Sequence, residues 1–119
     1  MPPIHPFRRR DLLRTAGALA LGRTALAQTP DSAFWAAAQQ PGTVLLMRHA
    51  QTEPGIGDPP GFRLGECGTQ RNLSEAGRAQ ARQLGQRFVS QGVAVAEVRS
   101  SAWCRCVDTA QLAFGRSQV

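Results

Sequence analysis

The sequence lacks several features that would point to common classes of protein. It contains no lysine and no tyrosine, so all 14 of its basic side chains are arginines. The apolar stretch at residues 15–22 is about eight residues long, far short of the roughly 20 that a membrane-spanning helix needs. The two histidines and three cysteines match no common metal-ligand spacing. We therefore expect no membrane span, no metal and no other cofactor.

The strong positive charge is concentrated at the N-terminus. The net charge is +6, of which residues 1–27 supply +4, with five arginines against one aspartate. Residues 28–119 carry nine arginines against seven acidic residues and supply only +2. Nucleic-acid-binding domains carry their basic patches on the folded surface. We therefore expect no nucleic-acid partner.

The first 27 residues have the features of an export signal. Three arginines at positions 8–10 precede a short apolar stretch, and Ala25-Leu26-Ala27 then offers small residues to a signal peptidase. The pattern resembles a twin-arginine signal, although Arg8 stands where that signal has serine or threonine. It predicts a bacterial periplasmic or secreted protein that engages the export machinery and is cleaved after Ala27. A basic tail without this function, or a start codon assigned too far upstream, is the alternative.

The rest of the chain divides into an edge segment and one domain. Residues 28–42 contain Phe34-Trp35 within an alanine-rich stretch, end at Pro41-Gly42, and predict a linker or edge segment. Residues 43–119 predict a single small domain. Within it, residues 51–72 are rich in proline and glycine and predict a long loop, of the kind that is often functional.

An apolar run at residues 44–47 predicts the first strand, over about residues 43–48, buried on both faces as in a parallel sheet. The run ends in the adjacent Arg48 and His49. In open α/β sheets the carboxyl ends of strands are where ligands bind. A guanidinium beside a nucleophile suits an anion that will be attacked, such as a phosphoryl group.

A helix, a second strand and a second helix are expected to follow. Ser74 is a good helix N-cap, and small and apolar residues recur on one face of a helix predicted over residues 75–91. Residues 93–99 predict a strand, and residues 103–114 predict a helix. This order predicts a right-handed βαβ unit with two parallel strands.

The predicted unit brings a second arginine to the Arg48-His49 pair. In a parallel βαβ unit the carboxyl ends of both strands lie on the same edge. Arg105 stands in the first turn of the second predicted helix, where free backbone N–H groups favour an anion. Two guanidiniums and a helix start together predict a phosphate clamp.

Three motifs resemble those of the histidine phosphatase superfamily, the phosphoglycerate-mutase-like fold. L-M-R-H-A-Q-T at residues 46–52 is similar to its R-H-G/A-x-T signature, and L-S-E-A-G-R-A-Q-A at 73–81 to its L-[ST]-x-x-G-x-x-Q-A helix start. S-A-W-C-R-C-V-D-T-A at 101–110 resembles its S-x-x-x-R-x-x-x-T-A element. The resemblance spans about residues 43–115. It implies an α/β fold with three layers, α/β/α around a parallel sheet, present here as an incomplete N-terminal portion with a βαβα core.

The resemblance also implies roles for individual residues. His49 would be the nucleophile of a phosphomonoester hydrolase and form a phosphohistidine, while Arg48 and Arg105 hold the phosphoryl oxygens of a phosphorylated small-molecule substrate. Neutral imidazole is a competent nucleophile at neutral pH, and phosphoryl transfer needs mainly positioning and charge neutralisation. The candidates for substrate contact are Thr52, Arg71, Asn72 and Ser101.

The superfamily pattern also includes a second histidine and a general acid, which the sequence does not supply. The other histidine is His5, within the expected export signal. Of the available carboxylates, Glu53, Asp58 and Glu66, none stands where the family acid is expected. General acid catalysis contributes about 10²–10⁴ in rate. We therefore expect a truncated domain of weak or no activity, with a non-catalytic phosphate-binding fragment as the alternative.

The three cysteines are an odd set for an oxidising compartment. Cys104 and Cys106 are too near in sequence to pair easily at a helix start. Cys67, at the far end of the 51–72 loop, is expected to pair with either Cys104 or Cys106 and to pin the loop. A zinc site of three thiols and a histidine is disfavoured because the spacing matches no common ligand pattern.

Overall fold

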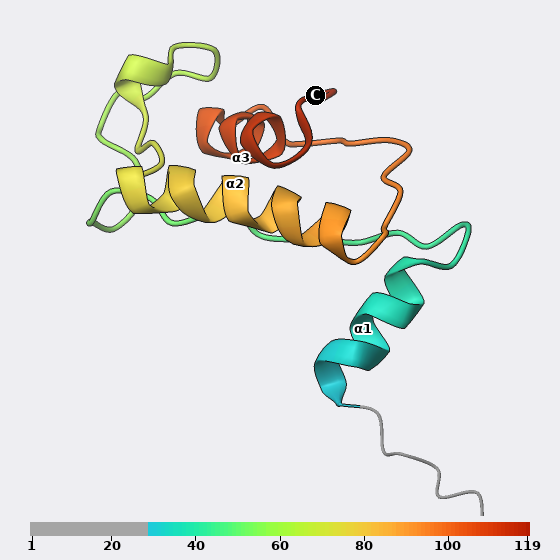
Figure 1. Cartoon of the computed structure of the whole chain (residues 1–119). Coiled ribbons are helices and arrows are strands. Elements are labelled where there is room, and N and C mark those ends of the chain that lie inside the picture. The colour runs from blue at the N-terminus through green and yellow to red at the C-terminus, as the bar shows by residue number, and fades with distance from the viewer. Residues whose placement is uncertain (1–28) are drawn as a thin grey trace, which may run out of the picture.

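The computed structural model describes residues 29–119, so the export signal expected over residues 1–27 lies outside the described part of the chain. Helices α1 (Pro30–Ala38), α2 (Glu75–Ser90) and α3 (Cys104–Phe114) are joined by irregular chain and by a short 3-10 helix, η1 (Cys67–Thr69). Figure 1 shows α3 lying against α2, with α1 beside the C-terminal end of α2. No helix in the described residues is both long and apolar enough to cross a bilayer.

The predicted three-layer fold with a parallel sheet and a βαβα core is wrong for this structure. Within residues 29–119, helices are the only regular secondary structure longer than a single pair of residues. Strand pairing is limited there to two isolated bridges, an antiparallel one between Thr52 and Leu73 and a parallel one between Arg99 and Gln118. The helices are therefore packed on each other and on irregular chain, without a sheet between them.

The two segments predicted to be strands lack a neighbouring strand. Residues 44–47 make no backbone hydrogen bond to another described residue, and Val44 and Leu46 are 82% and 95% exposed. The segment at 93–99 forms a bridge only at its last residue, Arg99. A strand is stabilised by cross-strand hydrogen bonds and side-chain pairs. An apolar run without such a neighbour therefore remains irregular chain, whatever its composition predicts.

The start of α2 and the end of α3 lie where they were predicted, at residues with local signals. The Ser74 side chain accepts a hydrogen bond from the backbone N–H of Gly77 (3.0 Å), which caps the start of α2. α3 ends at Gly115, whose φ of 70° is a left-handed conformation that glycine adopts without strain. These signals are local to the chain, so they act without the predicted sheet.

Two small hydrophobic clusters make up the core. The first cluster joins α1 to α2: the ring of Trp35 packs edge-to-face on Phe88 (centroids 5.3 Å apart), which packs in the same way on Phe114 of α3 (5.2 Å). The second cluster lies around Ala50 and Ala81, both buried. It places the chain segment that follows His49 directly against α2.

Two glycines let the backbone of α2 come into direct contact with the backbone of neighbouring segments. A Cβ atom at Gly85 would lie 1.9 Å from the carbonyl oxygen of Ala113 in α3. A Cβ atom at Gly77 would lie 1.8 Å from the carbonyl oxygen of Gln51. Both obstacles are backbone atoms, which cannot move aside as a flexible side chain does.

We expect Gly85→Ala and Gly77→Ala each to lower the free energy of unfolding by about 3 kcal/mol, the upper range for overpacking. In an open helix the same change would instead stabilise by about 1 kcal/mol through helix propensity. Urea unfolding measures the difference, with Gly68→Ala as the matched control because nothing lies within 4 Å of a Cβ there. Variants as stable as the wild type would mean that α2 does not approach this closely.

Candidate functional site

Four of the predicted site residues line one surface cavity of about 420 Å³: Arg48, His49, Thr52 and Arg71. Arg48 and His49 end the apolar segment, and Thr52 follows three residues later. Arg71 comes from the end of the 51–72 loop, and Gln80 of α2 closes the cavity from the helix side. The structure thus places two arginines, a histidine and a threonine around one opening.

The backbone around His49 is fixed by side chains from both long helices. The Ala50 N–H donates to Thr109 Oγ1 in α3 (3.0 Å). The next N–H, of Gln51, donates to Gln80 Oε1 in α2 (2.9 Å). Thr109 in turn donates to the carbonyl oxygen of Arg105 (2.7 Å), one turn earlier in α3. The segment carrying His49 is therefore attached to the helix that carries Arg105.

The imidazole of His49 has a defined hydrogen-bond partner. Its Nδ1 lies 2.8 Å from the carbonyl oxygen of Ala50, and the residue is half-buried. A carbonyl oxygen only accepts hydrogen bonds, so Nδ1 must carry the hydrogen. The neutral ring then has its lone pair on Nε2. This is the tautomer required for nucleophilic attack by Nε2.

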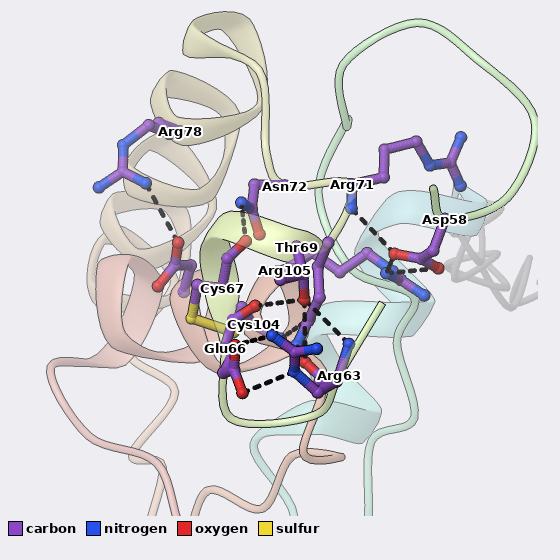
Figure 2. Close-up of a disulfide and its surroundings, with 12 residues drawn as sticks. Asp58, Arg63, Glu66, Cys67, Thr69, Arg71, Asn72, Arg78, Cys104 and Arg105 are labelled. Atoms are coloured by element: carbon purple, nitrogen blue, oxygen red, sulfur yellow. Dashed lines mark hydrogen bonds and ion pairs between the residues drawn. A yellow bond between two sulfur atoms is a disulfide. The ribbon is translucent and has the colours of Figure 1, made fainter. Parts of the chain in front are cut away.

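Arg105 does not line the His49 cavity and is bound instead by a carboxylate. Its Nη1 donates to both oxygens of Asp58, at 2.9 and 3.2 Å. Its guanidinium carbon lies 4.3 Å from the centroid of the Trp103 ring, a cation–π contact. Figure 2 shows Asp58 between this guanidinium and the backbone nitrogen of Arg71, which donates to Asp58 Oδ1 (2.9 Å).

These contacts change the acidity of Asp58. The backbone N–H of Arg71 and the guanidinium of Arg105 hold the pKa of Asp58 below its ordinary value of 3.8, against burial, which raises it. A lowered pKa in the folded state stabilises the fold above the unfolded pKa. The contribution of Asp58 to stability is therefore complete at neutral pH and is lost as the pH falls through the folded-state pKa.

The other two predicted contact residues lie apart from His49. Asn72 donates from Nδ2 to the carbonyl oxygen of Cys67 (2.7 Å) and lines a second cavity, along with Asp58 and Arg71. The second cavity adjoins the first, since both are lined by Arg71 and by residues 53–55. Ser101 is exposed before α3 and lines neither cavity.

A disulfide joins Cys67 of η1 to Cys104 at the start of α3, with the Cα atoms 5.5 Å apart. Of the two partners that the sequence left open for Cys67, the structure has Cys104, and Cys106 is free and half-buried. Gln70, also buried, accepts from the Cys104 N–H through Oε1 (2.9 Å). Figure 2 shows the disulfide joining η1 to the start of α3, one residue before Arg105, so it ties the loop to the helix that carries Arg105.

Three residues with clear contacts were given no role on sequence grounds. Thr109 stands four residues after Arg105, which places both on one helix face, so the R-x-x-x-T spacing was an available signal. Asp58 had no such signal, because its partners come from two distant segments. Trp103 immediately precedes the helix and gave no pattern of its own.

The site as described is a cavity lined by two arginines and by a histidine whose tautomer suits nucleophilic attack. No group of three or more side chains suited to hold a metal ion occurs within residues 29–119. A family model of the histidine phosphatase superfamily (branch 1) matches residues 44–119. The chain therefore belongs to the histidine phosphatase superfamily, as its motifs predict. Neither the curated proteins nor the solved structures give a match to this chain.

Proposed function

We propose that the protein hydrolyses phosphomonoesters through a phosphohistidine formed on His49. The observation that carries this proposal is the hydrogen bond between Nδ1 and the Ala50 carbonyl, which assigns the lone pair to Nε2 in a cavity shared with Arg48 and Arg71. Superfamily membership supports phosphatase-type chemistry on a phosphorylated substrate. The guanidiniums supply the charge neutralisation that phosphoryl transfer needs.

In the proposed reaction, the Nε2 lone pair attacks phosphorus and forms an N–P bond while the P–O bond to the alcohol breaks. The leaving oxygen takes a proton from solvent. Water then attacks phosphorus, releases a proton to solvent, and the electrons of the N–P bond return to Nε2. Orthophosphate leaves the cavity. Arg48 and Arg71 are proposed to bind the non-bridging oxygens, and Arg105 is proposed to assist them from the adjoining Asp58 pair.

The test is to mix the protein with a chromogenic aryl phosphate and follow both products. We expect release of the phenol together with a protein-bound phosphate that is labile in acid and stable in base, as a phosphohistidine is. Mass spectrometry of a rapidly quenched digest should place this phosphate on the peptide containing His49. Turnover with the phosphate on another residue would contradict the proposal.

Phosphate binding without turnover is the second candidate. It is favoured by one observation: within residues 29–119, His49 is the only histidine, so no second imidazole in this part of the chain assists it. Under this alternative, orthophosphate binds to the cavity, yet neither phenol release nor a phosphohistidine is detected. Titration calorimetry with orthophosphate, run beside the aryl phosphate assay, separates the two functions.

We also propose that the protein is exported and cleaved after Ala27. The Cys67–Cys104 disulfide supports this, since disulfides persist mainly in oxidising compartments such as the bacterial periplasm. Expression in a bacterial host followed by N-terminal sequencing of the periplasmic fraction should give a chain that starts at Gln28. Replacing Arg9 and Arg10 by lysine should retain the uncleaved protein in the cytoplasm, and export that is unaffected would count against a twin-arginine signal.

A further inference from the structure

The ion pair between Asp58 and Arg105 differs from the others in the described residues. Its side chains are only 11% (Arg105) and 9% (Asp58) exposed, whereas every other ion pair within residues 29–119 has side chains at least 39% exposed. A buried ion pair adds little net stability, because desolvation of both charges offsets their attraction. We therefore expect the pair to act mainly by fixing the positions of the two side chains, and less by stabilising the fold.

Asp58 holds Arg105 by one nitrogen and leaves the opposite edge of the guanidinium without a protein partner. Nη1 is bound to the carboxylate, and Trp103 covers one face of the guanidinium. Nε is buried with no hydrogen-bond partner, and Nη2 donates to no described residue. Nε and Nη2 together form the edge that binds two oxygens of one anion in a bidentate fashion.

The same carboxylate also fixes the chain at Arg71. Asp58 Oδ1 accepts from the Arg71 backbone N–H, and Arg71 Nη1 donates to the carbonyl oxygen of Gly55 (2.6 Å). Arg71 Nε, like that of Arg105, is buried and has no partner. Arg71 lines the cavity that contains His49. One buried carboxylate thus holds two arginines, each with an unused N–H donor.

We propose that Asp58 is a positioning residue for phosphoryl binding, a role that rests on the proposed function of the His49 cavity. It orients Arg71, which lines the His49 cavity, and Arg105, which lines neither cavity but is bound to Asp58 of the second, so that their unpartnered edges bind the phosphoryl oxygens of the substrate. The attachment of α3 to the His49 segment, through Thr109 and the Ala50 N–H, fixes the position of Arg105 relative to His49. Asp58 itself takes no part in bond making.

A role for Asp58 as a competitor of phosphate predicts the opposite change in phosphate affinity when Asp58 is removed. A carboxylate that only competed with phosphate for the guanidinium would weaken phosphate binding, so its removal would tighten it. A positioning carboxylate strengthens binding, so its removal weakens it. The direction of the change in affinity therefore decides between the two.

Asp58→Asn is the variant that tests the proposal. The amide oxygen, in the place of Oδ1, still accepts from the Arg71 N–H and from Arg105 Nη1, but the negative charge and the second acceptor, Oδ2, are lost, so Arg105 is held less firmly. We expect the dissociation constant for orthophosphate, measured by titration calorimetry at pH 7 and fixed salt, to rise about tenfold, as a misplaced binding group requires. Glu66→Gln is the matched control: Glu66 lies on the same loop and pairs with Arg63, yet both side chains are more than half exposed. It should leave the dissociation constant unchanged.

A double-mutant cycle with Arg105→Ala shows whether Asp58 acts through Arg105. We expect Asp58→Asn to have a much smaller effect once Arg105 is absent, a result that a general loosening of the fold would not produce. An unchanged or tighter dissociation constant for Asp58→Asn, or an equal effect in both backgrounds, overturns the proposal. Wild-type protein that fails to bind orthophosphate overturns the proposed function itself.

Arg105→Lys provides the second variant if Asp58→Asn does not fold, as judged by thermal melting. Lysine keeps the charge opposite Asp58 but lacks the Nε–Nη2 edge. We expect it to bind orthophosphate about tenfold more weakly than the wild type, because a bidentate contact is lost. Full affinity in this variant would show that the unpartnered edge does not bind phosphate, which also overturns the proposal.

Discussion

Replacement of His49 by alanine is expected to reduce aryl phosphate hydrolysis by on the order of a thousandfold or more, because the variant has no nitrogen to form the covalent intermediate. The fold should be retained. The described partner of the imidazole is the carbonyl oxygen of the neighbouring Ala50, and the residue is only half-buried. The loss should therefore appear in kcat with little change in the thermal midpoint.

The chain offers a matched control for this experiment in its other histidine. His5→Ala changes a residue of the expected export signal, so the exported and cleaved product should have wild-type activity. His49→Asn is the more demanding variant, since its amide nitrogen is no nucleophile although its size is similar. Activity of either His49 variant within a few fold of the wild type would exclude a phosphohistidine on this residue.

Removal of the disulfide has the largest expected effect on stability. The Cys67–Cys104 bond closes a loop with a sequence separation of 37 residues. In the chain-entropy account, such a cross-link stabilises the folded state by about 4 kcal/mol. We therefore expect a double substitution, Cys67→Ala with Cys104→Ala, to lower the free energy of unfolding by about this amount, which urea denaturation measures.

Cys106→Ala is the matched control for the disulfide, because Cys106 lies on the same helix and is free. It should change stability by less than about 1 kcal/mol, since it removes only a half-buried thiol. Treating the wild type with a thiol reductant should reproduce the effect of the double variant. If the reduced protein is as stable as the oxidised protein, the bond does not constrain the chain as the structure indicates.

The parts of the fold that could be predicted are those with local causes. Ser74 caps a helix through an N–H three residues away, and Gly115 ends one through its own φ. The strand prediction at residues 44–47 depended on a neighbour that the sequence pattern does not specify. Apolar composition indicates what a segment tends to do beside another strand, and here no described strand lies beside it. The prediction of a sheet therefore failed, although the prediction of helices did not.

The contacts in the site likewise divide into those that follow from the local sequence and those that do not. Arg48 and His49 are adjacent in sequence, so their presence in one cavity follows from the chain itself. The contact between Arg105 and Asp58 joins residues 47 apart, and it depends on the path of a proline- and glycine-rich loop. Motif spacing could identify Arg105 as a candidate but could not show which group holds it. That information exists only in the three-dimensional arrangement.

The 51–72 loop is fixed at two points: the Thr52–Leu73 bridge joins its two ends, and the disulfide ties Cys67 of η1 to α3. Between these two fastenings, Ile56 and Leu64 extend into solvent. Under the function that we propose, these exposed side chains could contact the alcohol part of an ester while the arginines stay fixed. Substitutions at positions 56 and 64 should then change the preference among phosphate esters without weakening phosphate binding.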